Sequence, residues 1–282
     1  MLTDTHCHLD KIGDFNTIKT ELVKTKNVGI ENIIIPTINE QNFNDVLHLN
    51  KLNELNKLNK LNESKNIEIP KLYFAVGIHP FYATNNINIK ESLENLHNFY
   101  LQNTKKIIAV GEIGLDFYDK NKYKNKYKNK YNIPQMKLLF EEQLKFAKEY
   151  NLPIIIHCRK AFNDIIERVK KIGISRGIFH AFNGSLEIAN IIIKNGFYLG
   201  FGGAITYEKA TKLRRLLTQI SCQNIVLETD APYMQPAWIN KTINNTPSQL
   251  FDIAKCIANI KNIPLQTLAE ITTNNAKTAL AL

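Results

Sequence analysis

The sequence predicts an α/β protein, a closed (β/α)8 barrel of the TIM-barrel type, from three observations. Short apolar, β-branched runs recur along the 282 residues, and each is followed by a turn signal and a longer amphipathic stretch. Runs such as IIIP, IIAVG and PIIIHC are apolar enough for parallel strands buried on both faces. Eight such runs alternate with helices, which favours a barrel. An open, doubly wound sheet is the alternative, but no GxGxxG or GxxxxGKS/T turn supports it.

The expected elements alternate between strand and helix along the chain. The strands, each rich in β-branched or other apolar residues, are expected at Leu2–His8, Asn32–Pro36, Leu72–Ile78, Ile107–Glu112, Pro153–His157, Gly177–His180, Phe197–Phe201 and Asn224–Asp230. The amphipathic helices are expected at about 15–27, 40–62, 88–102, 135–150, 161–172, 186–195, 207–220 and 247–260, with a final helix near 264–281. Because barrels of about 250 residues are commonly one domain, we expect a single domain over residues 1–282.

Two low-complexity tracts, at about 50–66 and 119–132, are expected to be insertions in the barrel. In the first, leucines 49, 52, 55, 58 and 61 recur every third residue, whereas a stable helical stripe alternates threes and fours. We therefore expect a weak helical extension, with a short coiled-coil contact as the alternative. In the second, residues 120–131 read KNKYKNKYKNKY and hold six lysines without an acid.

The net charge of +10 comes mostly from these two tracts. It therefore does not indicate a basic groove across the molecule, and biased composition in solvated loops is the favoured interpretation. The alternative is that the lysine–tyrosine tract binds a polyanion through charge and stacking.

The remaining composition predicts a cytoplasmic protein with no membrane segment and no obligate protein partner. The N-terminus, MLTDTHCHLD, has no basic region followed by an apolar stretch, so we expect no signal peptide. No apolar run approaches the ~18 residues that a membrane span needs. The four cysteines are scattered and include no CxxC pair, which is typical of a reducing compartment.

The histidines gather at the ends of the expected strands. Five of the seven lie at or just beyond a C-terminal strand end, namely His6, His8, His79, His157 and His180. Glu112 and Asp230 share that position, whereas His48 and His97 fall in helical segments where a solvated role is expected. Active sites of such barrels are built at the C-terminal rim, so this distribution predicts a functional site there.

His6 and His8 form an HxH pair in the first expected strand. Side chains two residues apart on a strand point the same way, so both imidazoles can face the barrel mouth and bind a divalent cation, while Cys7 points away. Two core or surface histidines are the alternative. Asp230 closes the last strand, which neighbours the first in a closed barrel, and this favours a metal site.

Glu112, His157 and His180 follow one another on the fourth, fifth and sixth expected strands. A carboxylate between two cations can bridge them, and the two histidines would complete a second centre. Glu112 bound to backbone and His157 as a neutral core residue are the alternatives, but a charge beside IIAVG requires a cation or another partner. Two cations can activate a shared water, and Asp230 is the candidate to take its proton.

Six motifs, DTHCHLD, GIHP, VGEIGLDFY, PIIIHCRKA, GIFHAFNGS and LETDAPYM, resemble those of the TatD family of metal-dependent deoxyribonucleases, within the amidohydrolase-like barrels. They run in the expected order from residue 4 to about 234. The resemblance implies a binuclear site for Mg, Mn or Zn and hydrolysis of phosphodiester bonds in DNA. It assigns one cation to His6, His8, Glu112 and Asp230, and the other to Glu112, His157 and His180.

The resemblance also bears on substrate recognition. It implies that His79 lies near the substrate, and Arg159 could pair with a phosphate oxygen, although a hydrogen bond to a ligand and a salt bridge at the rim remain the alternatives. Two departures affect substrate preference. The loop YMQPAWINKTINNTP keeps Asn245-Thr246-Pro247 but lacks the arginine usual in the family, and the insertion after GLDFY sits beside the mouth.

Three functions are consistent with these features. The first is a two-metal phosphodiesterase that trims 3′ ends of DNA, and the second is the same site hydrolysing a small-molecule ester, lactone or amide. The third is a non-catalytic scaffold that uses the lysine–tyrosine tract, which the complete ligand set disfavours. A nuclease predicts an open, basic cleft, whereas a small-molecule hydrolase predicts a closed pocket with apolar walls.

Overall fold

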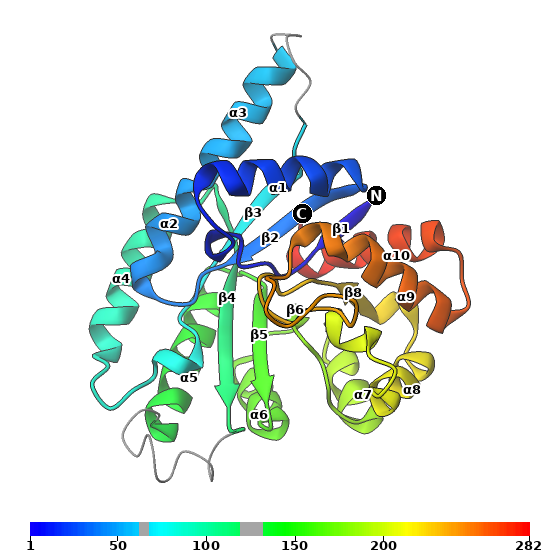
Figure 1. Cartoon of the computed structure of the whole chain (residues 1–282). Coiled ribbons are helices and arrows are strands. Elements are labelled where there is room, and N and C mark those ends of the chain that lie inside the picture. Colours follow the sequence, from blue (N-terminus) through cyan, green and yellow to red (C-terminus); the bar gives the residue numbers. More distant parts are fainter. Residues whose placement is uncertain (62–67, 119–131) are drawn as a thin grey trace.

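The computed structural model of the chain describes residues 1–61, 68–118 and 132–282, and it has the predicted (β/α)8 architecture (Figure 1). Eight parallel strands are hydrogen-bonded in chain order. The strands are β1 (Leu2–Asp4), β2 (Ile30–Pro36), β3 (Lys71–Val76), β4 (Ile107–Asp116), β5 (Ile154–Arg159), β6 (Gly177–Phe179), β7 (Phe197–Phe201) and β8 (Ile225–Leu227). Bonds from Thr5 N to Leu227 O (3.0 Å) and from Asp230 N to His6 O (2.8 Å) join the first and last strands. The barrel prediction is confirmed.

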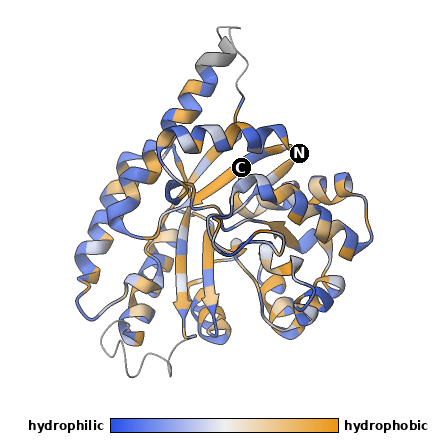
Figure 2. Ribbon diagram, in the orientation of Figure 1, coloured by the Kyte–Doolittle hydropathy of each residue, from blue (hydrophilic) through white to orange (hydrophobic). Residues whose placement is uncertain are grey.

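Helices surround the strands, and their hydrophobic faces turn toward the sheet (Figure 2). They are α1 (Phe15–Asn27), α2 (Phe43–His48), α3 (Asn50–Leu61), α4 (Ile89–Gln102), α5 (Ile133–Glu149), α6 (Phe162–Ile172), α7 (Leu186–Lys194), α8 (Thr211–Gln219), α9 (Leu250–Lys261) and α10 (Leu265–Leu280). Side chains cap several N-termini; Asp14, for example, accepts a hydrogen bond from Thr17 N at α1. No helix in the described ranges has both the length and the apolarity that a membrane span requires.

The segment expected as one helix over 40–62 is divided, which corrects that prediction. A short 3-10 turn precedes α2, and Leu49 separates α2 from α3. Leu49 and Leu52 are buried, so the start of the leucine tract packs against the barrel, while Leu55 is 41 % exposed. Beyond that start, α3 projects away from the barrel (Figure 1). The expected helical extension is therefore present up to Leu61. The lysine–tyrosine tract at 120–131 lies outside the described residues.

The strand ends also differ from the expected ones. β1 ends at Asp4 rather than His8, and β8 ends at Leu227 rather than Asp230, whereas β4 continues to Asp116. After β1 the backbone forms hydrogen bonds alternately with β8 and β2. Thr5 N donates to Leu227 O of β8, and Cys7 N donates to Ile34 O of β2, so these residues do not continue β1 as a regular strand. β4 continues because β5 pairs with it. At Gly114, whose φ is +153°, a Cβ would lie 1.9 Å from His157 O, so this pairing requires glycine.

The interior of the barrel is apolar, and α10 closes one end of it. Ile34, Ala75, Ala109, Ile155, Ile178 and Val226 come from six strands and form one buried cluster with Ala276, Ala279 and Leu280 of α10. Asn275 of α10 donates to Cys222 O and Ile225 O (both 2.7 Å), at the start of β8. α10 therefore covers the N-terminal ends of the strands, which leaves the C-terminal ends for a site.

Candidate metal centre

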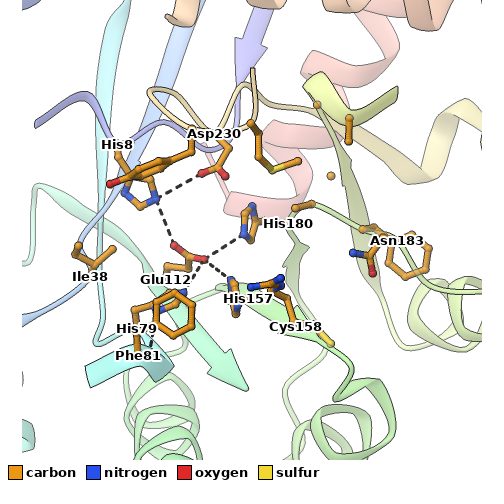
Figure 3. A pocket seen from close by; sticks show the side chains of 18 of the residues that line it. His8, Ile38, His79, Phe81, Glu112, His157, Cys158, His180, Asn183 and Asp230 are labelled. Carbon is orange, nitrogen blue, oxygen red and sulfur yellow. Dashed lines mark hydrogen bonds and ion pairs between the residues drawn. The ribbon is translucent and has the colours of Figure 1, made fainter. Parts of the chain in front are cut away.

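The polar residues predicted at the rim converge on one point at the C-terminal ends of the strands (Figure 3). The seven residues are His6 and His8 after β1, His79 after β3, Glu112 in β4, His157 in β5, His180 after β6 and Asp230 after β8. Each is at most 9 % exposed. Burying so many ionisable groups is costly unless they pair with one another or with a cation. Their contacts therefore decide what the cluster can do.

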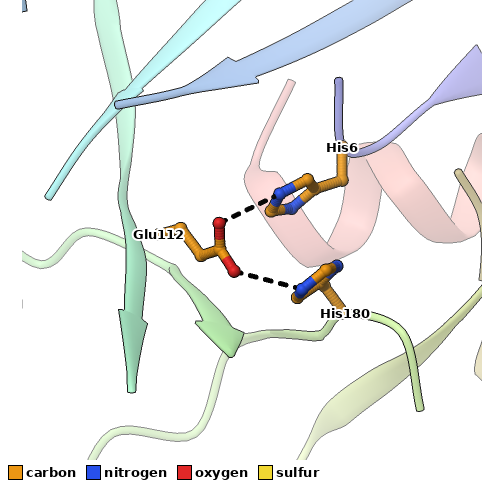
Figure 4. Close-up of side chains that lie close together, drawn as sticks. All are labelled: His6, Glu112 and His180. Carbon is orange, nitrogen blue, oxygen red and sulfur yellow. Dashed lines mark ion pairs between the residues drawn. The ribbon is translucent and has the colours of Figure 1, made fainter. Parts of the chain in front are cut away.

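Glu112 lies at the centre of the cluster, and its two oxygens face different histidines (Figures 3 and 4). Oε2 lies 3.3 Å from Nε2 of His6 and 3.4 Å from Nε2 of His8. Oε1 lies 2.9 Å from Nδ1 of His157 and 3.1 Å from Nε2 of His180. The carboxylate thus stands between two pairs of imidazole nitrogens, as a ligand shared by two cations would.

Asp230 completes the side of the cluster that holds His6 and His8. Its Oδ1 lies 3.7 Å from Nε2 of His6 and 3.6 Å from Nε2 of His8. Asp230 has a left-handed backbone (φ +53°), a conformation that aspartate tolerates better than most residues. The buried carboxylate of Asp4 accepts hydrogen bonds from Thr229 N (2.9 Å) and Thr229 Oγ1 (2.6 Å), and this fixes the turn that carries Asp230.

Charge within the cluster shifts the protonation of its members. Burial alone raises the pKa of Glu112, but the surrounding histidines, chiefly His79, His180 and His6, hold it well below its usual range. Burial raises the pKa of Asp230 to about 6. For His180, burial acts to lower the pKa, and Glu112 outweighs it, so the pKa lies well above the usual value. Glu112 is therefore an anion that needs positive charge on both sides.

The donor set fits divalent cations. Potential ligand atoms lie within 4.8 Å of one another in three groups among the described residues, namely His6–His8–Asp230, His6–Glu112–His180 and His79–Glu112–His157. Nε2 of His6 and Nε2 of His8 are 3.2 Å apart and point at the same acceptors. Imidazole suits zinc and carboxylates suit magnesium and manganese, so the mixed set can take any of the three.

His79 belongs to the cluster but has a different role from the other histidines. Its Nδ1 accepts a hydrogen bond from Phe81 N (3.1 Å), and its Nε2 lies 3.4 Å from Oε1 of Glu112. Burial lowers the pKa of His79 to about 4, so the ring is neutral near pH 7 and carries its proton on Nε2. In this tautomer Nε2 donates a hydrogen bond and has no lone pair for a metal.

Arg159 lies at the edge of the cluster and is partly exposed. Its Nη1 is 3.3 Å from Oδ2 of Asp116, and its guanidinium stacks 4.1 Å from the centre of the Tyr118 ring. Nζ of Lys160 lies 4.7 Å from the same ring centre. These contacts hold the guanidinium beside the mouth, where it can meet an anionic substrate group.

Sequence reasoning missed two carboxylates that lie behind the predicted ligands. Oδ2 of Asp116 lies 3.1 Å from Nε2 of His157, and Oε1 of Glu228 lies 3.5 Å from Nδ1 of His180. Both acids belong to motifs that were recognised, GLDFY and LETDAPYM. Their positions in those motifs were the available signal, but the strand pairing that brings each one to a histidine is visible only in three dimensions.

A pocket of about 860 Å³ opens onto the cluster. Apolar and aromatic side chains form much of its wall, among them Ile38, Phe81, Tyr82, Phe182, Phe201, Leu213, Tyr233 and Met234. Phe81, Tyr82 and Tyr233 are each at least 40 % exposed and stand at its mouth. Arg159 is the only lysine or arginine among the described residues that line it. The pocket combines a charged floor with apolar walls.

A (β/α)8 barrel with a buried cluster of histidines and carboxylates at its C-terminal rim is an arrangement that metal-dependent hydrolases use. The family model described as TatD related DNase matches residues 3–281, and the chain belongs to this family. It is therefore a metal-dependent hydrolase of the TatD type.

Relatives agree with this assignment. The chain is 30 % identical over 276 residues to the uncharacterised metal-dependent hydrolase YjjV of Escherichia coli K12, covering 98 % of this chain and 96 % of that protein. It is 30 % identical over 279 residues to the uncharacterised metal-dependent hydrolase YabD of Bacillus subtilis, covering 98 % of each. The crystal structure of YjjV, a TatD homologue, superposes with a TM-score of 0.83 at 29 % identity, covering 100 % of this chain and 98 % of that one.

More distant structures share the fold alone. A TatD family hydrolase from Entamoeba histolytica has a TM-score of 0.78 at 23 % identity, covering 99 % of this chain and 98 % of that one. A lactonase from Listeria monocytogenes has a TM-score of 0.67 at 14 % identity, covering 99 % and 94 %.

Proposed function

We propose that this hydrolase cleaves phosphodiester bonds in DNA, trimming 3′ ends, with two divalent cations bound around Glu112. The observation that carries the proposal is the position of Glu112, whose two oxygens each face a separate pair of histidine nitrogens at 2.9–3.4 Å. The description of the family as DNases supports DNA as the substrate class.

The ligands divide into two centres. The His6–His8 centre comprises His6, His8, Asp230 and Oε2 of Glu112, and the His157–His180 centre comprises His157, His180 and Oε1 of Glu112. Magnesium, manganese or zinc bound there would lower the pKa of a shared water and neutralise charge that develops on the substrate. Glu112 holds the two centres at a fixed separation, which makes it the residue on which both depend.

Asp230 is the proposed general base. Its carboxylate adjoins both histidines of the His6–His8 centre, where it could accept a proton from the water that attacks the substrate. Without a cation, burial raises the pKa of Asp230 to about 6, and a bound cation would lower this pKa and keep the carboxylate ionised, as a base must be. Asp230 and Glu112 are thus the two catalytic residues of this proposal.

His79 and Arg159 are the proposed substrate-binding residues. Neutral His79 offers its Nε2–H to an oxygen of the scissile phosphate, as a fixed donor aimed at developing charge. Arg159, whose side chain is 40 % exposed, can bind a second phosphate oxygen by a charge-assisted hydrogen bond. Together they would orient the phosphate toward Asp230.

A second function is favoured by the walls of the pocket. Its volume of about 860 Å³ falls in the range of small-molecule sites, its walls are largely apolar, and Arg159 is its single lysine or arginine within the described ranges. These features suit an ester, lactone or amide better than a long strand. The same six metal ligands would serve that reaction.

One assay distinguishes these two functions. The chelated protein is given Mn²⁺, Mg²⁺ or Zn²⁺, then a single-stranded oligonucleotide labelled at its 5′ end, beside a panel of carboxylic esters, lactones and amides. DNase activity predicts metal-dependent loss of nucleotides from the 3′ end. Turnover of the small-molecule panel with an intact oligonucleotide would replace the DNase proposal by the second function. The Asp230→Asn variant serves as the control against a contaminating nuclease.

We also propose a cytoplasmic location. All four cysteines, Cys7, Cys158, Cys222 and Cys256, carry free thiols. Disulfides are rare in reducing compartments, so free thiols support this location.

A further inference from the structure

The two proposed centres differ in what lies behind their histidines. In the His157–His180 centre, each ring turns one nitrogen to Glu112 and the other to a second carboxylate. Nε2 of His157 is hydrogen-bonded to Asp116 at 3.1 Å, and Nδ1 of His180 forms an ion pair with Glu228 at 3.5 Å that does not meet hydrogen-bond geometry. A neutral imidazole that donates from one nitrogen keeps its lone pair on the other. With a cation in place of the proton, His157 would donate from Nε2 to Asp116 and offer its Nδ1 lone pair, and the charge of Glu228 would favour the corresponding arrangement at His180.

The two carboxylates are themselves held in place. Asp116 accepts a hydrogen bond from Tyr118 N (2.9 Å) and pairs with Arg159. Glu228 is completely buried and accepts a hydrogen bond from Ala181 N (2.6 Å). Each acid therefore directs its charge at a histidine from a fixed position. Carboxylates placed in this way orient ligating histidines and increase their basicity.

The His6–His8 centre lacks this support in the described part of the chain. Nδ1 of His6 and Nδ1 of His8 are buried and have neither a hydrogen-bond partner nor an ion pair there, whereas Nδ1 of His180, which also has no hydrogen bond, keeps its ion pair with Glu228. Their tautomers are fixed only by the atoms in front of them, which are Glu112 and Asp230. The affinity of this centre for a cation therefore depends on the two carboxylates that face it. No carboxylate among the described residues supports the opposite nitrogens of its histidines.

We propose that Asp116 and Glu228 are positioning residues that make the His157–His180 centre the tighter of the two cation sites, so that it fills first and the His6–His8 centre exchanges its ion. This inference rests on the two-metal part of the proposed function. It is independent of the substrate, because it concerns metal affinity in the absence of DNA or ester. Asp116, which makes the shorter contact, has the larger effect.

Calorimetric titration of the chelated full-length protein with Mn²⁺ tests this order. The expected result is two binding steps of unequal affinity. Asp116→Asn and Glu228→Gln each weaken the tighter step by about 10–100-fold and leave the weaker step within about threefold. Asp10→Asn is the matched control. It removes a buried charge near His8 that is held by Lys11 and Asn42, and both steps should stay within about threefold.

A second readout separates positioning from a loss of folding. Nitrogen-15 NMR of the histidine rings should report His157 with its proton on Nε2, and Asp116→Ala should change that tautomer while the circular dichroism spectrum is unaltered. Asp116→Asn keeps an acceptor and should preserve the tautomer. If His157 keeps the same tautomer in Asp116→Ala, Asp116 does not position it and the inference is overturned.

The possible titrations have distinct meanings. Two steps with only the tighter one weakened support the inference, whereas two steps weakened equally, or not at all, overturn it and leave two-metal binding intact. A single step weakened by both variants supports the role of Asp116 and Glu228 but removes the two-metal function. A single step unaffected by both variants overturns the two together.

Discussion

The two ends of the barrel bury residues of opposite kinds. At the N-terminal end, Ile34, Ile155 and Leu280 pack in an apolar cluster closed by α10. At the C-terminal end, His6, Glu112 and other ionisable groups are buried just as deeply. Burial of apolar groups stabilises the fold, whereas burial of unpaired charges costs stability and is retained where chemistry needs it. The barrel thus separates the residues that hold it together from those proposed to act.

The largest expected effect is at the C-terminal end. Glu112→Ala should lose both cations and lower kcat/KM by more than about 10³-fold, because a ligand shared by both centres is removed. Metal content by mass spectrometry and hydrolysis of the preferred substrate measure these losses. Glu142→Ala, which removes a partly buried acid on α5 that pairs with Lys145, is the control. Normal turnover in Glu112→Ala would remove its bridging role.

Asp230→Asn should have the next largest effect. Loss of the proposed base lowers kcat by about 10²–10⁴-fold, while His6, His8 and Glu112 still retain some metal. Steady-state kinetics with metal analysis of the same sample separates the two roles. An unchanged kcat would exclude Asp230 as the base, and a complete loss of metal would reduce its role to that of a ligand.

A substitution at the N-terminal end of the barrel should lower stability and leave activity largely unchanged. Ile34→Ala removes a fully buried side chain on β2, a strand that carries none of the proposed ligands, and should cost about 2–5 kcal/mol of unfolding free energy. At temperatures where the variant is folded, kcat should remain within about twofold. Urea denaturation and kinetics test this, with Ile34→Val as a milder companion. A large fall in kcat in folded protein would show that the two ends are coupled.

Metal removal should also lower the stability of the protein. A cation that binds only the folded state adds about 2.7 kcal/mol at a free concentration 100 times its Kd, so chelation should lower the unfolding free energy by about that amount for each cation bound. Thermal unfolding with and without Mn²⁺ gives the shift, and the Glu112→Ala variant should show almost none. An equal shift in that variant would place the stabilising ion elsewhere.

Most of the fold could be predicted from sequence because its signals are local. A run such as that around Ile155 is apolar throughout, and such runs alternate with amphipathic helices, which the barrel requires. The ends were less predictable, because pairing with a neighbour decides where a strand stops. β4 continues to Asp116 through its contacts with β5, a condition that the sequence of β4 does not contain.

The ligand set was also accessible, whereas the supporting residues were not. His6, His8, His157 and His180 follow apolar runs directly, so their positions at the rim could be inferred. Asp4 fixes the turn at Thr229 through a hydrogen bond between residues 225 positions apart, and the sequence does not show this contact. The structure shows that the predicted ligands lie close together. Their assigned roles stay predictions, as does the single-domain organisation.

The seam between β1 and β8 has a consequence for the order of events during synthesis. His6 leaves the ribosome more than two hundred residues before Asp230, whose N–H bonds to His6 O. A nascent chain therefore carries an incomplete His6–His8 centre until its last strand docks. Binding of a cation at that centre would therefore indicate that β8 has paired with β1 and that the barrel is closed.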